Sequence, residues 1–166
     1  LLKEYNDIEF IFVGEGQKKA QILKVIAQRK MKNCKVYDHV ARENLAYSLS
    51  CADLGLVSLS PGHVGGSVPS KAFAMMASGA PLVAIMEEGA EVARVISEFE
   101  CGKVIRSGDV RAFKEYVLAL YHDPDTLRKQ SINSLAAFEK GYALSKVAGK
   151  YQALIAVLNQ PDPLRV

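Results

Sequence analysis

A glycine-rich loop that runs into a short helix is the part of the sequence best suited to chemistry. Residues 65–71 read Gly-Gly-Ser-Val-Pro-Ser-Lys, and an apolar stretch follows them. Free backbone N–H groups at a helix start, with a lysine beside them, form a site for phosphate. A lysine at this end of the helix dipole destabilises the helix by a few tenths of a kcal/mol unless a bound anion offsets its charge. We therefore expect Ser70 and Lys71 to bind a phosphate group, although proline and serine are also ordinary helix starters.

A second glycine turn follows the first apolar strand. Gly14 and Gly16 stand two residues apart, but Lys19 occupies the place of the third glycine in a dinucleotide-binding G-x-G-x-x-G pattern. The turn is interpreted either as a strand-to-helix connection that needs positive φ or as a place where a ligand approaches the backbone closely. Binding of NAD remains an alternative.

Three glutamates follow a later strand and form a third candidate group. Glu87, Glu88 and Glu91 are either acidic ligands or a solvated loop, and Glu91 stands at an expected helix start, where the dipole favours a carboxylate. The sequence leaves both interpretations open.

The cysteines and histidines do not indicate a metal site. Cys34, Cys51 and Cys101 are far apart in the sequence and fit no Cys-x-x-Cys spacing, and the three histidines are equally scattered. We expect the thiols to be reduced and to lie in the core, because free cysteine is usually buried.

Composition indicates one ordinary domain. The chain has 166 residues, is 49% hydrophobic and carries a formal net charge of +3, which is too small to indicate a nucleic-acid partner. No membrane-spanning or secretory segment is recognised, so the cytoplasm is the expected location. The first residues look like the last turn of a helix, which predicts an upstream strand and helix, and an upstream domain as well.

Strand and helix patterns alternate along the chain. Strands are expected at 8–13, 34–37, 54–59, 81–85 and 103–105, and helices at 17–31, 42–51, 91–99 and 144–158, after 69–71, and after the capping residues Asp109 and Asp123. Such repeats predict an α/β fold, a Rossmann-like doubly wound parallel sheet with helices on both faces. Segment 54–59 is nearly all apolar, as in a strand covered on both faces. The domain is expected to span 1–158, followed by a tail at 159–166.

The carboxyl ends of parallel strands meet at one edge of a sheet, where ligands of open α/β folds bind. This rule places four segments around one expected crevice: 14–16, 37–40, 60–71 and 86–91.

Ordered sequence blocks then resemble a known family, the C-terminal half of group 1 glycosyltransferases of the retaining GT-B type. The blocks are 12–16 (Phe-Val-Gly-Glu-Gly), 36–40 (Val-Tyr-Asp-His-Val), 51–57 (Cys-Ala-Asp-Leu-Gly-Leu-Val), 77–84 (Ala-Ser-Gly-Ala-Pro-Leu-Val-Ala) and 101–105 (Cys-Gly-Lys-Val-Ile). The resemblance extends from about the first residue to Leu158.

The resemblance implies a domain that binds a nucleoside diphosphate sugar, with UDP favoured, and an upstream N-terminal domain that holds a saccharide or lipid-linked acceptor. It implies no cofactor, metal or nucleic acid, names no catalytic residue, and allows peripheral membrane association through the missing domain. The final helical stripe would pack on the sheet or toward that domain. The donor-binding set that it implies comprises Gly14, Gly16, Tyr37, Val40, Gly66, Ser67, Ser70, Lys71, Ala74 and Glu91.

One departure from the family pattern concerns two glutamates that group 1 enzymes usually carry near the donor sugar and the ribose. Gly66 and Ala74 stand at those positions. Their replacement keeps two alternatives open: a non-catalytic nucleotide-binding or scaffold relative, and a sugar-nucleotide epimerase, for which no acid–base set is visible.

Overall fold

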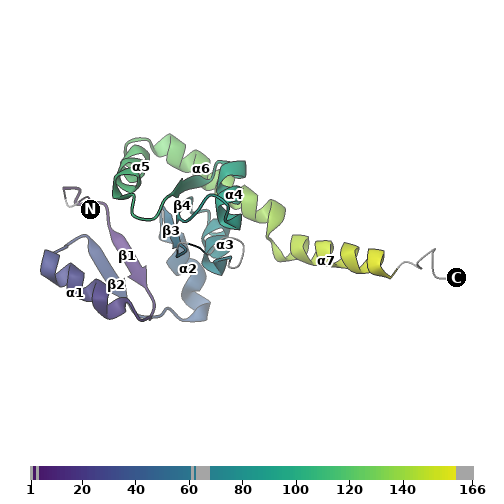
Figure 1. Cartoon of the computed structure of the whole chain (residues 1–166), viewed down its shortest axis with the longest axis horizontal. Coiled ribbons are helices and arrows are strands. Elements are labelled where there is room, and N and C mark those ends of the chain that lie inside the picture. The colour runs from purple at the N-terminus through teal and green to yellow at the C-terminus, as the bar shows by residue number, and fades with distance from the viewer. Residues whose placement is uncertain (1, 3, 61, 63–67, 160–166) are drawn as a thin grey trace. The chain divides into compact units, whose positions relative to one another are not determined.

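The computed structural model describes residues 2, 4–60, 62 and 68–159, in two compact units, Leu1–Cys51 and Ala52–Val166. Strands and helices alternate until the last strand, after which three helices follow in succession (Figure 1), and every strand pair in the described residues is parallel. The predicted α/β class is therefore confirmed, with the strands in two hydrogen-bonded sheets.

The first unit contains a two-stranded parallel sheet. Its elements are β1 (Phe10–Val13), α1 (Lys19–Arg29), β2 (Cys34–Tyr37), the 3₁₀ turn η1 (Arg42–Asn44) and α2 (Leu45–Ser50). Val13 lies opposite Tyr37 in the register, so the loops that follow the two strands leave from the same edge.

The second unit contains a three-stranded parallel sheet in the order β3-β4-β5. The strands are β3 (Gly55–Ser58), β4 (Leu82–Ile85) and β5 (Gly102–Ile105), and the helices are α3 (Ser70–Ala77), α4 (Glu91–Phe99), α5 (Val110–His122), α6 (Pro124–Gly141) and α7 (Leu144–Leu158). Each expected element exists, and the bounds of α4 and α7 are those predicted.

The core of the second unit surrounds its central strand. Leu82, Val83 and Ala84 of β4 have no exposed surface, as expected for a strand covered on both faces. On β3 Val57 is buried, whereas Leu56 is 39% exposed. The expectation that segment 54–59 is covered on both faces is therefore wrong for Leu56, because β3 is an edge strand of its three-stranded sheet, whereas Val83, the neighbour of Leu56 in the register, lies on the central strand.

Two aspartates begin helices as the sequence predicts. The Asp109 carboxylate accepts a hydrogen bond from the Ala112 N–H at 2.9 Å, and the Asp123 carboxylate accepts one from the Thr126 N–H at 3.0 Å. Each side chain satisfies an N–H group that has no acceptor within its helix.

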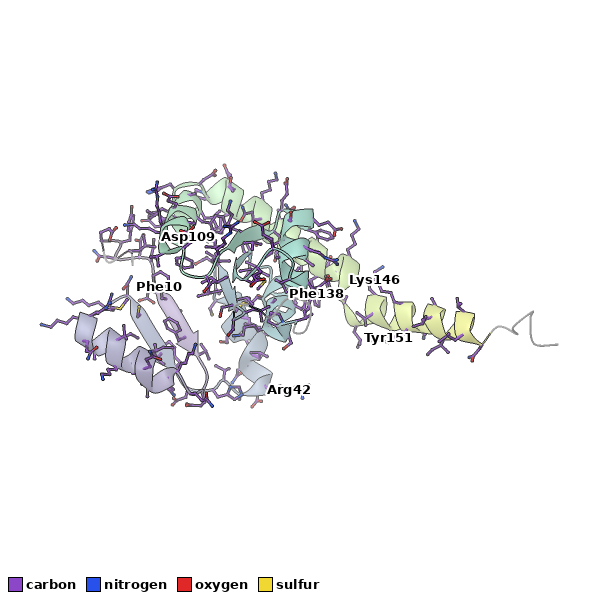
Figure 2. The ribbon with its side chains drawn as sticks, viewed as in Figure 1. Phe10, Arg42, Asp109, Phe138, Lys146 and Tyr151 are labelled. Carbon is purple, nitrogen blue, oxygen red and sulfur yellow. The ribbon has the colours of Figure 1, made fainter. Side chains whose placement is uncertain are left out.

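The final helix α7 leaves its apolar side chains exposed (Figure 2). Leu144 is 84% exposed, Leu158 is 74% exposed, and α7 has no buried residue. The expectation that this stripe packs on the sheet is wrong, because α7 continues beyond α6 instead of folding over the strands of its unit. Packing of α7 toward another part of the protein stays a prediction.

The cysteines divide by environment. Cys101 is buried, as predicted, and burial raises the pKa of its thiol to about 11. Cys34 is half-buried. The prediction is wrong for Cys51, which is exposed because it follows the end of α2. Across the part of the chain that the structure describes, no helix is long and apolar enough to cross a membrane.

Candidate functional site

The start of α3 lies at the carboxyl edge of the three-stranded sheet. Pro69 is the N-cap and Ser70 the first helical residue, and the Ala72 N–H donates to the Pro69 carbonyl at 2.9 Å. No side chain caps this helix within the described residues, and its first turn contains no acid. The first N–H groups of a helix find no acceptor within it, so this end favours an anion.

Lys71 adds a full positive charge at this helix start. Its side chain is exposed, and it has no ion-pair partner among residues 2, 4–60, 62 and 68–159. Ser70 is exposed beside it. The predicted residues Gly66 and Ser67 lie outside the described residues.

The loop after β4 reaches the same edge. The Leu59 N–H donates to the Ile85 carbonyl at 3.0 Å, which continues the β3–β4 ladder beyond the strand ends. The Gly62 N–H then donates to Glu87 Oε1 at 3.0 Å. Glu87 thus holds the beginning of the loop that leads to α3, a role that the sequence alone did not assign.

Ala74 lies on α3, one turn after Ser70, and is half-buried. Its methyl group offers neither charge nor a hydrogen bond, so any acceptor for ribose hydroxyls must come from elsewhere.

Glu91 is the first residue of α4, where the helix dipole favours its charge. Its Oε2 forms an ion pair with Arg94 at 2.7 Å, and its Oε1 accepts a hydrogen bond from the Tyr142 hydroxyl at 3.2 Å. Both oxygens have protein partners, although the side chain keeps 38% of its surface exposed. Whether Glu91 also acts as an acidic ligand stays a prediction.

Tyr142 follows α6 and links three helices. Its ring stacks on Phe73 of α3, with centroids 4.2 Å apart and planes inclined by 26°. Burial, together with the bond to Glu91, raises the pKa of Tyr142 to about 12. The hydroxyl therefore stays protonated and remains a donor at neutral pH.

In the first unit, the predicted residues Gly14 and Tyr37 lie side by side. The Gly14 N–H donates to the Tyr37 carbonyl at 3.1 Å, and Gly14 has φ +120°, a conformation that favours glycine. Gly16 needs no positive φ. Tyr37 is 51% exposed and Val40 is half-buried. The need for glycine is thus confirmed at Gly14 only.

An ion-pair cluster ties the two loops of this unit together. Lys19 Nζ lies 2.5 Å from Asp38 Oδ1 and also binds Glu15. The hydrogen bond from Lys19 lowers the pKa of Asp38, and the bonds to Asp38 and Glu15 raise the pKa of Lys19. The lysine that broke the glycine pattern therefore holds 14–16 against 37–40.

Sequence reasoning did not single out Tyr142, and it did not foresee the contacts of Lys19 with Asp38 or of Glu87 with Gly62. Glu15 precedes α1, so its four-residue spacing from Lys19 was not a helical signal. The other contacts join residues distant in the sequence and left no local signature.

Comparisons with known proteins place these features in context. The family model described as "Glycosyl transferases group 1" matches residues 1–123. A curated protein of Pseudomonas aeruginosa, "Probable glycosyltransferase WbjE", is 32% identical over 93 residues, which are 56% of this chain and 23% of that protein.

Solved GT-B glycosyltransferases share the fold. Sucrose-phosphate synthase from Thermosynechococcus elongatus aligns with a TM-score of 0.72 at 17% identity, over 89% of this chain and 38% of its own. TarM of S. aureus was solved as a mutant in complex with fondaparinux, alpha-GlcNAc-glycerol and UDP. It aligns with a TM-score of 0.70 at 18% identity, over 92% of this chain and 30% of its own. The pneumococcal O-GlcNAc transferase GtfA, solved with UDP and GlcNAc, aligns with a TM-score of 0.69 at 16% identity, over 95% of this chain and 31% of its own. The chain thus spans between about a fifth and two fifths of these proteins.

Proposed function

Because the chain belongs to the group 1 glycosyltransferase family, we propose that it is the half of a sugar transferase that binds the donor, a nucleoside diphosphate sugar. The proposed donor is a UDP-sugar and the acceptor a saccharide or lipid-linked saccharide of polysaccharide or glycoconjugate assembly. UDP in the solved complexes of TarM and GtfA supports the choice of base. The acceptor would bind a part of the protein outside this chain, and α7 would pack toward that part.

The observation that carries the proposal is the start of α3. It combines N–H groups, no acid in the first turn, and Lys71 without an ion-pair partner among the described residues. A diphosphate supplies the negative charge that such a helix end favours.

In the proposed transfer, charge develops on the diphosphate as the bond to the sugar breaks. The N–H groups of α3 and Lys71 would stabilise that charge, and fixed donors of this kind are often the largest protein contribution to such reactions. Ser70 would add a hydroxyl donor. Gly14 and Gly16 would allow the nucleotide to approach the backbone, and backbone groups of 37–40 would meet the base.

Glu91 is proposed to act at the donor site indirectly, because Arg94 and Tyr142 already occupy its oxygens. Gly66 and Ser67 would complete the diphosphate loop.

A second candidate is a non-catalytic nucleotide-binding relative with the same fold. Ala74 favours it, because the half-buried methyl group on α3 replaces the carboxylate expected for ribose. Both candidates bind nucleotide, and only the first transfers sugar.

Calorimetric titration of the 166-residue chain with UDP, GDP, UMP and NAD tests the proposal. We expect UDP to bind more tightly than UMP or NAD, and Lys71→Ala to lower the UDP affinity about tenfold, since hydrogen bonds to charged groups contribute about 1.5–3 kcal/mol.

Lys146→Ala is the matched control, because Lys146 is an exposed lysine on α7 (Figure 2) and should leave the affinity unchanged. Absence of UDP binding, or an equal loss in both variants, would overturn the proposal.

A further inference from the structure

Helix α6 holds the carboxyl-terminal end of α3. The Ser131 hydroxyl donates to the Gly79 carbonyl at 2.6 Å, and the Ser134 hydroxyl donates to the Ala80 carbonyl at 2.7 Å. Ser134 is fully buried, so its bond is shielded from water. These two bonds fix where α3 ends relative to α6.

The residue that follows α6 contacts the middle of α3. The ring of Tyr142 stacks on Phe73, which lies two residues after Lys71. Phe73 is the fourth residue of α3, one turn after Ser70, so a displacement of its backbone also displaces the N–H groups of Ser70 and Lys71. The stack therefore restrains the orientation of the helix start.

The hydroxyl of Tyr142 restrains the ring itself. It donates to Glu91 Oε1 at 3.2 Å, and Glu91 is in turn held by Arg94 on the same helix. A ring fixed by stacking at one face and by a hydrogen bond at its tip has little freedom to rotate. Tyr142 thus fixes the position of α3 relative to the start of α4.

We propose that Tyr142 is a positioning residue for the diphosphate of the donor. It sets the start of α3, through Phe73, at the place where the helix N–H groups and Lys71 meet the phosphates. This inference rests on the proposed function, because it assigns a role within the same site. Tyr142 itself does not touch the ligand.

The experiment compares the wild-type chain with Tyr142→Phe, Tyr142→Leu and Tyr116→Leu. Tyr116 is the matched control, because it is also half-buried and has a pKa raised to about 12 by burial. It lies on α5, and its hydroxyl donates a hydrogen bond to Gln130 of α6, whereas the ring of Tyr142 contacts α3. Two quantities are measured: hydrogen exchange of the amides 72–76 without ligand, and affinities for UDP and uridine by calorimetry.

We expect Tyr142→Leu to speed exchange in 72–76 about tenfold and to weaken UDP about fivefold, with uridine affinity unchanged because uridine has no phosphate. Tyr142→Phe keeps the stack, folds as the wild type does, and should weaken UDP by a smaller factor. Tyr116→Leu should change neither quantity, even where it lowers the unfolding temperature.

Two results overturn the inference. One is exchange in 72–76 that is no faster in Tyr142→Leu than in Tyr116→Leu. The other is an equal loss of UDP and uridine affinity, which would indicate general loosening of the fold. If the wild-type chain binds no UDP, the proposed function fails by itself and the diphosphate role fails with it, whereas the exchange data still decide whether Tyr142 holds α3.

Discussion

At the scale of single residues, the most informative side chain is one that broke a pattern. Lys19 stands where a dinucleotide motif would have glycine, and its ammonium group binds Glu15 and Asp38. All three side chains belong to the loops that follow β1 and β2 or to the start of α1. The Lys19 side chain therefore links the two loops, whereas a glycine at this position would leave room for a ligand to approach the backbone.

The pKa of Asp38 tests this cluster. We expect it to lie below the usual value of about 3.9, because the hydrogen bond from Lys19 stabilises the charged carboxylate. Lys19→Met should return it to the usual value, whereas Lys24→Met, on the same helix, should not. Carboxyl chemical shifts followed through a pH titration measure both effects.

The sign of the pH dependence follows from this shift. A depressed pKa contributes stability above the pKa of the unfolded chain, and that contribution is lost as the pH falls through the folded value. The difference in unfolding free energy between wild type and Lys19→Met should thus shrink below about pH 4. A constant difference from pH 7 to pH 2 would contradict the ion pair.

At the scale of elements, one glycine lets two strands of the second sheet approach. Gly102 opens β5 with φ +157°, and a Cβ at this position would lie 2.0 Å from the Leu82 carbonyl oxygen. Leu82 is fully buried on the central strand, so it cannot move away without opening the core.

Gly102→Ala should therefore destabilise the chain by more than about 2 kcal/mol, through strain at a special backbone position. Gly141→Ala is the control, since a Cβ there meets nothing within 4 Å, and its effect should stay within about 1 kcal/mol. Urea unfolding followed by circular dichroism measures both. Equal midpoints for the two variants would show that β4 and β5 can shift apart.

At the scale of the whole molecule, most of the buried apolar side chains among the described residues belong to the second unit. The core of the second unit gathers around β4, α3 and α4, whereas no residue of α7 is buried. Leu154 and Leu158 of α7 are 54% and 74% exposed. A continuous apolar stripe of this kind is typical of a surface that another part of a protein covers.

The double variant Leu154→Ser, Leu158→Ser should leave the unfolding free energy of this chain unchanged to within about 1 kcal/mol, because neither side chain is buried. Leu82→Ala, in the core, should cost about 2–5 kcal/mol. Thermal and urea unfolding compare the two. A loss above 2 kcal/mol in the double variant would mean that α7 packs on the chain in solution.

Local patterns were enough to predict much of the fold. The bounds of α4 and α7, the caps at Asp109 and Asp123 and the order of strands and helices depend on residues within one or two turns of each other. The same is true of the α3 start, since proline, serine and lysine stand next to one another. Periodicity and capping are properties of short segments, so a sequence displays them directly.

Other properties of the molecule depend on contacts between distant residues. Lys19 and Asp38 are 19 residues apart, and Tyr142 and Glu91 are 51 apart. Neither pair has a sequence pattern, because its geometry exists only after the intervening elements have packed. Burial also depends on distant contacts. The sequence pattern predicts that Leu56 and the apolar side chains of α7 are buried, but whether they are buried depends on which elements pack over them.

The amino-acid sequence alone therefore determined the α/β alternation, the family and the helix start suited to a phosphate. Only the tertiary structure decided that Glu91 is held by Arg94 and Tyr142, that Tyr142 stacks on the helix bearing Lys71, and that α7 stays uncovered in this chain. The physical reason is that propensity and periodicity act along the chain, whereas side-chain partners and burial are set by packing across it.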